Sequence, residues 1–195
     1  MSDLTRARRA APSAVVAGLL MGLLSLLPLT TRDSLADGAV SKEYQIKAAF
    51  LYNFTKFVEW PAASFRGADD SIVVGVYCTE PFAAELEKIV SGRKVNGRAL
   101  VVKQLETPKD ARALHLLFIC ADHDVLFGAI QSEIQSSPVL TVGESEPVSR
   151  HGGVIVFVRE DDKVRFEINM GAAERAGLKV SAQLQKLATI VRQAP

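Results

Sequence analysis

The sequence predicts an α/β protein with a mostly parallel sheet, helices on both faces, and an end made of an antiparallel hairpin and two C-terminal helices. Short apolar, β-branched runs alternate with helical stretches along the middle of the chain, which is the order of a parallel sheet. Near the end, residues 154–158 and 164–168 flank Asp161-Asp162 with alternating apolar residues, and this pattern predicts the hairpin.

The first 36 residues differ in composition from the rest. Three arginines within the first nine residues precede an almost uncharged apolar run, residues 14–29, and Ser34-Leu35-Ala36 places small residues where a signal peptidase reads. We predict a signal peptide that is cleaved after Ala36, so that nothing inserts in a membrane afterwards. A retained transmembrane anchor is the alternative, although the run is short for a span and holds Pro28 near its end.

Residues 37–195 are predicted to form one domain, long enough to bury a core without further covalent support. The leader holds four of the 23 Lys and Arg residues and two of the 22 Asp and Glu residues, so the rest carries 19 basic and 20 acidic side chains. The two signs are interspersed, and no basic stripe is present to neutralise phosphates. We therefore expect no nucleic-acid partner.

The first predicted helix begins at Ser41, a reasonable N-cap, and ends at Pro61, because the residue before a proline is pushed out of the α region. The helix and its flank hold seven of the thirteen aromatic residues of the chain. The rings surround the helix instead of lining one stripe, so it must be covered on more than one side.

The middle of the chain is predicted in the order β-α-β-α-β-α-β. The strands are expected at residues 72–77, 99–103, 114–119 and 138–142, and the helices at 81–90, 108–113 and 122–135.

After a polar loop at 143–153 and the hairpin, Asn169 is predicted to cap a short helix that ends at Gly177. Ser181 starts the last predicted helix, whose apolar face holds Leu184, Leu187, Ile190 and Val191.

No catalytic or cofactor motif is present. The chain lacks a Gly-rich dinucleotide loop after the first strand, a phosphate loop, a G-x-S-x-G elbow and an H-E-x-x-H helix. In the loop after the first strand, Glu80 would repel phosphate and Pro81 removes an amide donor. We predict that the protein is not an enzyme and has no cofactor; an unrecognised hydrolase is the alternative.

The three histidines are interpreted separately. His115 lies inside a predicted buried strand and is expected to pack in the core. His123 could join Cys78 and Cys120 in a zinc or copper site, but their spacing matches no closed site, so no metal is predicted. His151, in a glycine-containing loop, is expected to be solvated.

The two cysteines follow the first and third predicted strands, Cys78 and Cys120 respectively. In a doubly wound sheet of order 2-1-3-4 those strands are neighbours, so both sulfurs lie at the same carboxyl edge. An even cysteine count in an oxidising compartment favours pairing, and we predict a Cys78–Cys120 disulfide. Two separate buried thiols are the alternative.

Several segments together resemble the YfiR family of periplasmic proteins over nearly all of residues 37–195. The resemblance is carried by EYQIKAAFLYNF (43–54), FVEWP (57–61), VNGR (95–98), HLLFI (115–119), VLTV (139–142), GGVI (152–155) and VRFEIN (164–169). It implies a compact, often dimeric α/β domain that acts without catalysis. The best-understood member represses a membrane-bound diguanylate cyclase by contacting its periplasmic portion, and the redox state of its cysteines affects its activity. Many relatives have a cysteine where this chain has Leu114, so no disulfide of the family is carried over.

The leading hypothesis is a periplasmic repressor that binds the periplasmic portion of an inner-membrane signalling protein, with cyclic-di-GMP signalling implied by the resemblance and a homodimer possible. Aromatic residues are favoured interface anchors, and Tyr52, Phe57 and Trp60 are the candidates for partner binding. The alternative is a periplasmic small-ligand sensor, because parallel sheets offer a crevice at the carboxyl ends of their strands. That crevice would include Thr79, Glu80, Asp122 and Glu144.

Overall fold

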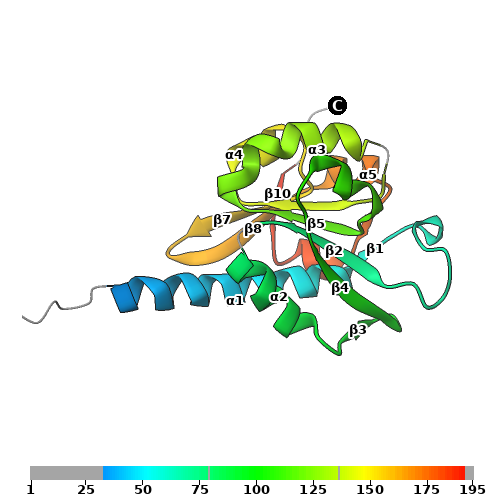
Figure 1. Ribbon diagram of the computed structural model, residues 1–195. Helices are drawn as coiled ribbons and strands as arrows, with labels where there is room; N and C mark the ends of the chain where they lie inside the picture. The colour runs from blue at the N-terminus through cyan, green and yellow to red at the C-terminus, as the bar shows by residue number, and fades with distance from the viewer. Residues whose placement is uncertain (1–32, 79, 136, 192–195) are drawn as a thin grey trace, which may run out of the picture. The chain divides into compact units, whose positions relative to one another are not determined.

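The computed structural model describes residues 33–78, 80–135 and 137–191, so most of the expected leader lies outside the described residues (Figure 1). The chain divides into two compact units, Met1–Ala36 and Asp37–Pro195, and the second unit contains the sheets.

An eight-stranded sheet runs through the second unit in the order β10-β8-β7-β6-β5-β2-β4-β3 (Figure 1). Its strands are β2 (Ile72–Tyr77), β3 (Lys94–Val95), β4 (Arg98–Gln104), β5 (Leu116–Ile119), β6 (Leu140–Gly143), β7 (Ile155–Glu160), β8 (Lys163–Asn169) and β10 (Thr189–Val191). The pairs of β2 with β4 and β5, of β5 with β6, of β6 with β7 and of β10 with β8 are parallel. The mostly parallel sheet and the 2-1-3-4 order of its first four predicted strands are thereby confirmed.

Helices cover both faces of this sheet, as predicted. The α1 helix (Asp33–Phe57) and α2 (Glu80–Val90) pack on one face, and α3 (Phe127–Glu133) and α4 (Glu146–Arg150) pack on the other with the 3-10 turns η2 (Pro108–Ala113) and η3 (Ala121–Leu126) (Figure 1). Strand β5 shows why two layers are needed: Leu116 and Phe118 enter one core cluster, and Leu117 and Ile119 enter the other. Alternate residues of a strand face opposite ways, so a run that is apolar throughout must be covered twice.

The hairpin forms as predicted. Strands β7 and β8 pair antiparallel with Phe157 opposite Phe166, and Asp161 and Asp162 both adopt left-handed φ values, 49° and 57°. Two consecutive positive φ angles give the tight turn whose twist matches that of paired strands. Asn169 then caps α5 (Met170–Arg175), because its Oδ1 accepts a hydrogen bond from the Ala172 amide at 2.9 Å.

The two ends of the first helix differ from the prediction. The α1 helix begins at Asp33 rather than Ser41, and no proline lies between these two residues to interrupt it. It stops at Phe57, four residues before Pro61. Val58 and Glu59 instead form β1 (Val58–Glu59), which pairs antiparallel with β9 (Lys179–Val180) and buries Val58.

The last predicted helix is wrong beyond its first turn. The α6 helix covers only Ala182–Gln185, and the chain continues as strand β10 beside β8. Three consecutive β-branched residues, Thr189, Ile190 and Val191, favour the strand, and Leu187 is left 63% exposed.

The region between residues 121 and 153 is also divided more finely than predicted. The helix expected at 122–135 is split into η3 and α3. The loop at 143–153 contains α4, which has Pro147 in its first turn and Val148 fully buried.

A disulfide joins the ends of β2 and β5, and its cysteines are Cys78 and Cys120. The two strands are paired up to Tyr77 opposite Ile119, so the next residue of each strand lies at the same sheet edge. The two Cα atoms are 5.2 Å apart, and both side chains are buried. This is the pairing that the strand order predicts.

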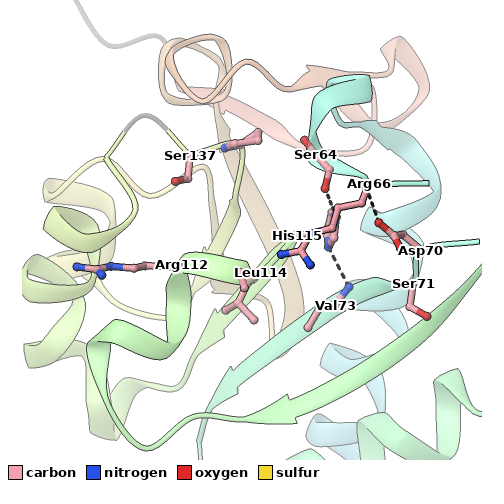
Figure 2. A pocket seen from close by; sticks show the side chains of 11 residues that line it. Ser64, Arg66, Asp70, Ser71, Val73, Arg112, Leu114, His115 and Ser137 are labelled. Carbon is pink, nitrogen blue, oxygen red and sulfur yellow. Dashed lines mark hydrogen bonds between the residues drawn. The ribbon is translucent and has the colours of Figure 1, made fainter. Parts of the chain in front are cut away.

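His115 anchors the connection between α1 and β2. Its Nδ1 accepts a hydrogen bond from the Val73 amide at 3.1 Å, and its Nε2 lies 3.2 Å from the Ser64 carbonyl oxygen (Figure 2). Because Nδ1 is an acceptor, Nε2 carries the proton in the neutral ring and donates to Ser64. Phe65 stacks on the imidazole at 4.5 Å between ring centroids. His115 therefore has the core role predicted for it.

The backbone of His115 extends the same anchor. Its carbonyl oxygen accepts hydrogen bonds from Trp60 Nε1 at 2.8 Å and from the Leu140 amide at 2.9 Å, and its amide donates to the Val73 carbonyl at 2.9 Å. Arg98 reinforces the connection from β4, donating to the carbonyl oxygens of Gly67 and Asp70.

We expect His115→Phe to lower the free energy of unfolding by about 1–3 kcal/mol, because the Val73 amide would lose its acceptor in a buried place. Burial lowers the pKa of His115 below its ordinary value of 6.5. The unfolded chain then takes up a proton at a higher pH than the folded chain, so this residue makes stability fall as pH drops below 6.5.

Chemical denaturation of the wild type and of His115→Phe between about pH 6.5 and pH 5 tests this. Over this range the free energy of unfolding should fall less in His115→Phe than in the wild type. In His151→Phe, which alters an exposed histidine, it should fall as much as in the wild type. An unchanged slope in His115→Phe would show that this imidazole does not titrate as described.

We expect the Cys78–Cys120 bridge in protein recovered from oxidising conditions. It closes a loop with a sequence separation of 42, and the loop-entropy model gives about 3–4 kcal/mol of stabilisation for that length. A reductant should lower the melting temperature of the wild type but not that of Cys78→Ser/Cys120→Ser. Mass spectrometry of unreduced peptides decides the pairing, and two alkylatable thiols in oxidised material would contradict it.

Candidate functional site

Tyr52 lies near the C-terminal end of α1 and packs against the core with one part of its ring exposed. Two cations lie over this ring: Lys56 Nζ is 5.4 Å from the ring centroid, and the Arg93 guanidinium carbon is 4.8 Å away. Such contacts are attractive because the face of the ring is electron-rich. Tyr52 thus connects the end of α1 to the turn before β3.

Phe57 lies five residues further along α1 and is also partly buried. The same Lys56 Nζ is 5.7 Å from its ring centroid. We call Tyr52, Lys56, Phe57 and Arg93 the α1 aromatic surface. Among the residues that the structure describes, neither Lys56 nor Arg93 is in an ion pair. Two positive charges therefore lie against the rings of this surface, with no carboxylate partner among the described residues.

Trp60, the third candidate for partner binding, has a different environment. Its indole N–H donates to the His115 carbonyl oxygen, and its ring meets the imidazole edge-on at 6.2 Å. A buried indole commonly finds such a partner for its N–H. The structure therefore brings Tyr52 and Phe57 to the same cation, Lys56, whereas Trp60 contacts His115 instead.

Lys47 lies at the carboxyl edge of the sheet, where the small-ligand crevice was predicted. It is only 7% exposed, and its Nζ is 2.5 Å from Glu43 Oε1 and 2.8 Å from Glu144 Oε1. Lys47 and Glu43 belong to α1, and Glu144 follows β6. Sequence reasoning missed this triad, although Glu43 and Lys47 have the i, i+4 spacing of a helical ion pair.

The charges of this triad stabilise one another. Burial lowers the pKa of Lys47, but hydrogen bonds to Glu144 and Glu43 outweigh burial and raise it above its ordinary 10.5. The hydrogen bond from Lys47 lowers the pKa of Glu43 below its ordinary 4.5. Both shifts favour the charged forms of Lys47 and Glu43, and Lys47 ties α1 to Glu144 in the loop after β6.

The crevice predicted at the carboxyl edge is a small cavity of about 220 Å³. It brings Asp122 and Glu144 together, with Lys47 and Cys120 also in its wall. Thr79 and the side chain of Glu80 lie outside the described residues. The lysine of this cavity already has two carboxylate partners, so little of its charge is free for a ligand.

The remaining histidines do not form a recognisable site. His123 lies beside Tyr77, with 5.5 Å between ring centroids, and the two cysteines considered with it as metal ligands are bonded to each other. Within residues 33–78, 80–135 and 137–191, no three His, Cys, Asp or Glu side chains are grouped to hold a metal ion. His151 is exposed, with Nδ1 2.7 Å from the Pro147 carbonyl oxygen.

Two solved structures that match this chain share little sequence with it. One is a conserved domain protein from Vibrio cholerae O1 biovar eltor strain N16961, with 11% identity, a TM-score of 0.49, and coverage of 77% of this chain and 60% of that one. The other is the ABC domain in complex with L-Trp from Streptococcus pneumonia, with 13% identity, a TM-score of 0.43, and coverage of 62% and 55%. The chain thus spans less than two thirds of either protein, and no protein of curated function matches it.

In the described part of the chain, no helix combines the length and apolar character needed to cross a membrane.

The family of the chain follows from a match along most of its length. Residues 44–189 match the family model described as YfiR/HmsC-like. This stretch runs from the start of the aromatic part of α1 through the sheet, the disulfide and the hairpin to β10. The chain therefore belongs to the YfiR/HmsC-like family.

Proposed function

We propose that this protein is a non-enzymatic regulator of the periplasm that binds and represses a membrane-bound signalling protein through the α1 aromatic surface. The family resemblance makes a diguanylate cyclase the proposed partner, and cyclic-di-GMP the signal whose level changes. Contact would be made with the periplasmic portion of that partner.

The observation that carries this proposal is the environment of Tyr52 and Phe57. Both rings keep an exposed part, and Lys56 and Arg93 lie against them without ion-pair partners in the described residues. Tyrosine and arginine are enriched at the energetic centres of protein interfaces. A rigid helix end that combines these groups is suited to a protein partner.

The chemistry of the other reactive groups supports a role without catalysis. Both ring nitrogens of His115 are engaged in hydrogen bonds, and the two cysteines are joined to each other. A general base or nucleophile needs a free atom within reach of a substrate. The small-ligand alternative at the carboxyl edge gains little support, because Lys47 in that cavity is already paired.

Alanine substitutions at Tyr52 and Phe57 test the proposed surface. We expect Tyr52→Ala or Phe57→Ala to leave the melting temperature within a few degrees, while weakening partner binding by about 2 kcal/mol or more. In a strain that lacks the gene, the wild type should lower cellular cyclic-di-GMP, and these variants should fail to do so at equal protein levels.

Two controls separate the surface from the core. Val125→Ala changes an apolar side chain that is 84% exposed on η3 and should behave as wild type. Trp60→Ala removes the donor to His115 and should lower stability by about 1–3 kcal/mol. If Tyr52→Ala and Phe57→Ala both unfold the protein, the rings are core; if both stay folded and fully active, the interface lies elsewhere.

Export is a separate prediction. If residues 1–36 are a cleaved leader, protein recovered from the periplasm should begin at or near Asp37, as intact-mass measurement would show. Full-length protein embedded in the inner membrane would contradict it and would indicate a retained anchor.

A further inference from the structure

A cavity of about 430 Å³ lies at the amino ends of β2, β5 and β6, the sheet edge opposite the disulfide (Figure 2). Its walls come from three segments that each precede a strand: the α1–β2 connection, the end of η2 with the residues that follow it, and the residues before β6. This volume lies in the range of small-molecule sites. It is about twice that of the cavity at the carboxyl edge.

The wall formed by the α1–β2 connection is fixed before any ligand arrives. His115 holds the Ser64 carbonyl and stacks on Phe65, while Arg98 holds the carbonyl oxygens of Gly67 and Asp70. These contacts hold the α1–β2 connection in place as one side of the cavity. A preformed wall reduces the ordering cost of binding.

The cavity is lined by two cations and one carboxylate. Arg66 and Arg112 contribute guanidinium groups and Asp70 contributes a carboxylate. Figure 2 shows Arg66 and Asp70 on one side of the cavity and Arg112 on the other. Asp70 Oδ2 already accepts hydrogen bonds from the amides of Arg66 and Gly67, and Arg112 is held through Nε and Nη2 by Glu133.

Arg66 is the cation left for a ligand. Its guanidinium is in no ion pair with any residue that the structure describes. The hydrogen bond from Arg66 to Asp70 comes from its backbone amide. An arginine fork matches the two oxygens of a carboxylate and can bind them with two parallel hydrogen bonds. His115 adds no charge to this wall, because both of its ring nitrogens are occupied.

Two further features point to an organic molecule. Ser64 Oγ is buried without a hydrogen-bond partner, which is uncommon because buried polar atoms are nearly always paired. Val73, Leu114 and Pro138 give the same cavity apolar wall that a bare inorganic ion would not use. We infer that this amino-edge cavity binds a small organic carboxylate, with its carboxylate on Arg66 and its apolar body against Leu114 and Pro138.

Nuclear magnetic resonance titration of the isotope-labelled protein tests the inference. The probes are acetate, succinate and benzoate, each compared with its neutral amide at equal ionic strength. We expect saturable shifts of the Gly67 and Ser137 amide signals with at least one carboxylate, and binding of the matching amide weakened at least about tenfold. This comparison needs no variant, so it does not depend on whether a substitution folds.

Variants then locate the site. Arg66→Ala should weaken carboxylate binding at least about tenfold. Ser137→Trp, which fills the cavity and removes no charge, should also abolish it. Lys163→Ala, which removes an exposed cation outside the cavity, should change affinity less than about twofold.

Four results would overturn the inference. They are no saturable shift with any carboxylate up to about 50 mM, equal binding of carboxylate and amide, full binding by Arg66→Ala, and binding of inorganic phosphate without binding of any carboxylate. The last result would assign the cavity to a different class of anion.

Discussion

The hydrogen bonds of His115 join three parts of the chain to the start of β5: the α1–β2 connection, β2 and β6. Its ring joins Val73 of β2 to Ser64 of the α1–β2 connection, and its carbonyl joins Trp60 to Leu140 of β6. A neutral imidazole suits this place because one ring nitrogen accepts while the other donates. A carboxylate would lack the donor, and a lysine would lack the acceptor. The anchor therefore requires both the shape of histidine and its neutral state.

This anchor and the Lys47 ion pairs fix α1 at two separate places. Lys47 holds the helix to Glu144 at the carboxyl edge, and Trp60, just after the helix, is held by His115 at the amino edge. Tyr52 and Phe57 lie between these two attachments. The partner surface that we propose is thus carried by an element whose direction is set by buried polar contacts, and such preorganisation lowers the cost of binding. The amino-edge cavity shares one wall with the same anchor, through Ser64 and His115.

Local chemistry in the sequence was enough to predict much of the fold. The run from Ile72 to Tyr77 is apolar and β-branched throughout, and it forms β2 with those limits. Asp161 and Asp162 tolerate left-handed backbone and form the hairpin turn. The position of Cys78 and Cys120 after neighbouring strands placed them at one edge. In each case the decisive property belongs to a short segment or follows from strand order.

The features that were missed depend on tertiary contacts. Residues 189–191 have helical spacing with Leu184, yet they add to the sheet because β8 offers a free edge. Val58 and Val180 pair only because their segments meet in space. The aromatic pattern nominated Trp60 together with Tyr52 and Phe57, but it could not reveal that the indole N–H reaches a carbonyl 55 positions further along the chain. Arg66 is a single charge in a loop, and no sequence pattern marks it.

The proposed function requires that Tyr52 faces a membrane protein in the cell. Site-specific photocrosslinking tests it most directly: p-benzoylphenylalanine replaces Tyr52 in one strain and Val125 in another, and the exported protein is irradiated in living cells. We expect a crosslink from position 52 to an inner-membrane signalling protein, and none to that protein from position 125 on η3. Crosslinks to the same protein from position 125 but not from position 52 would contradict it.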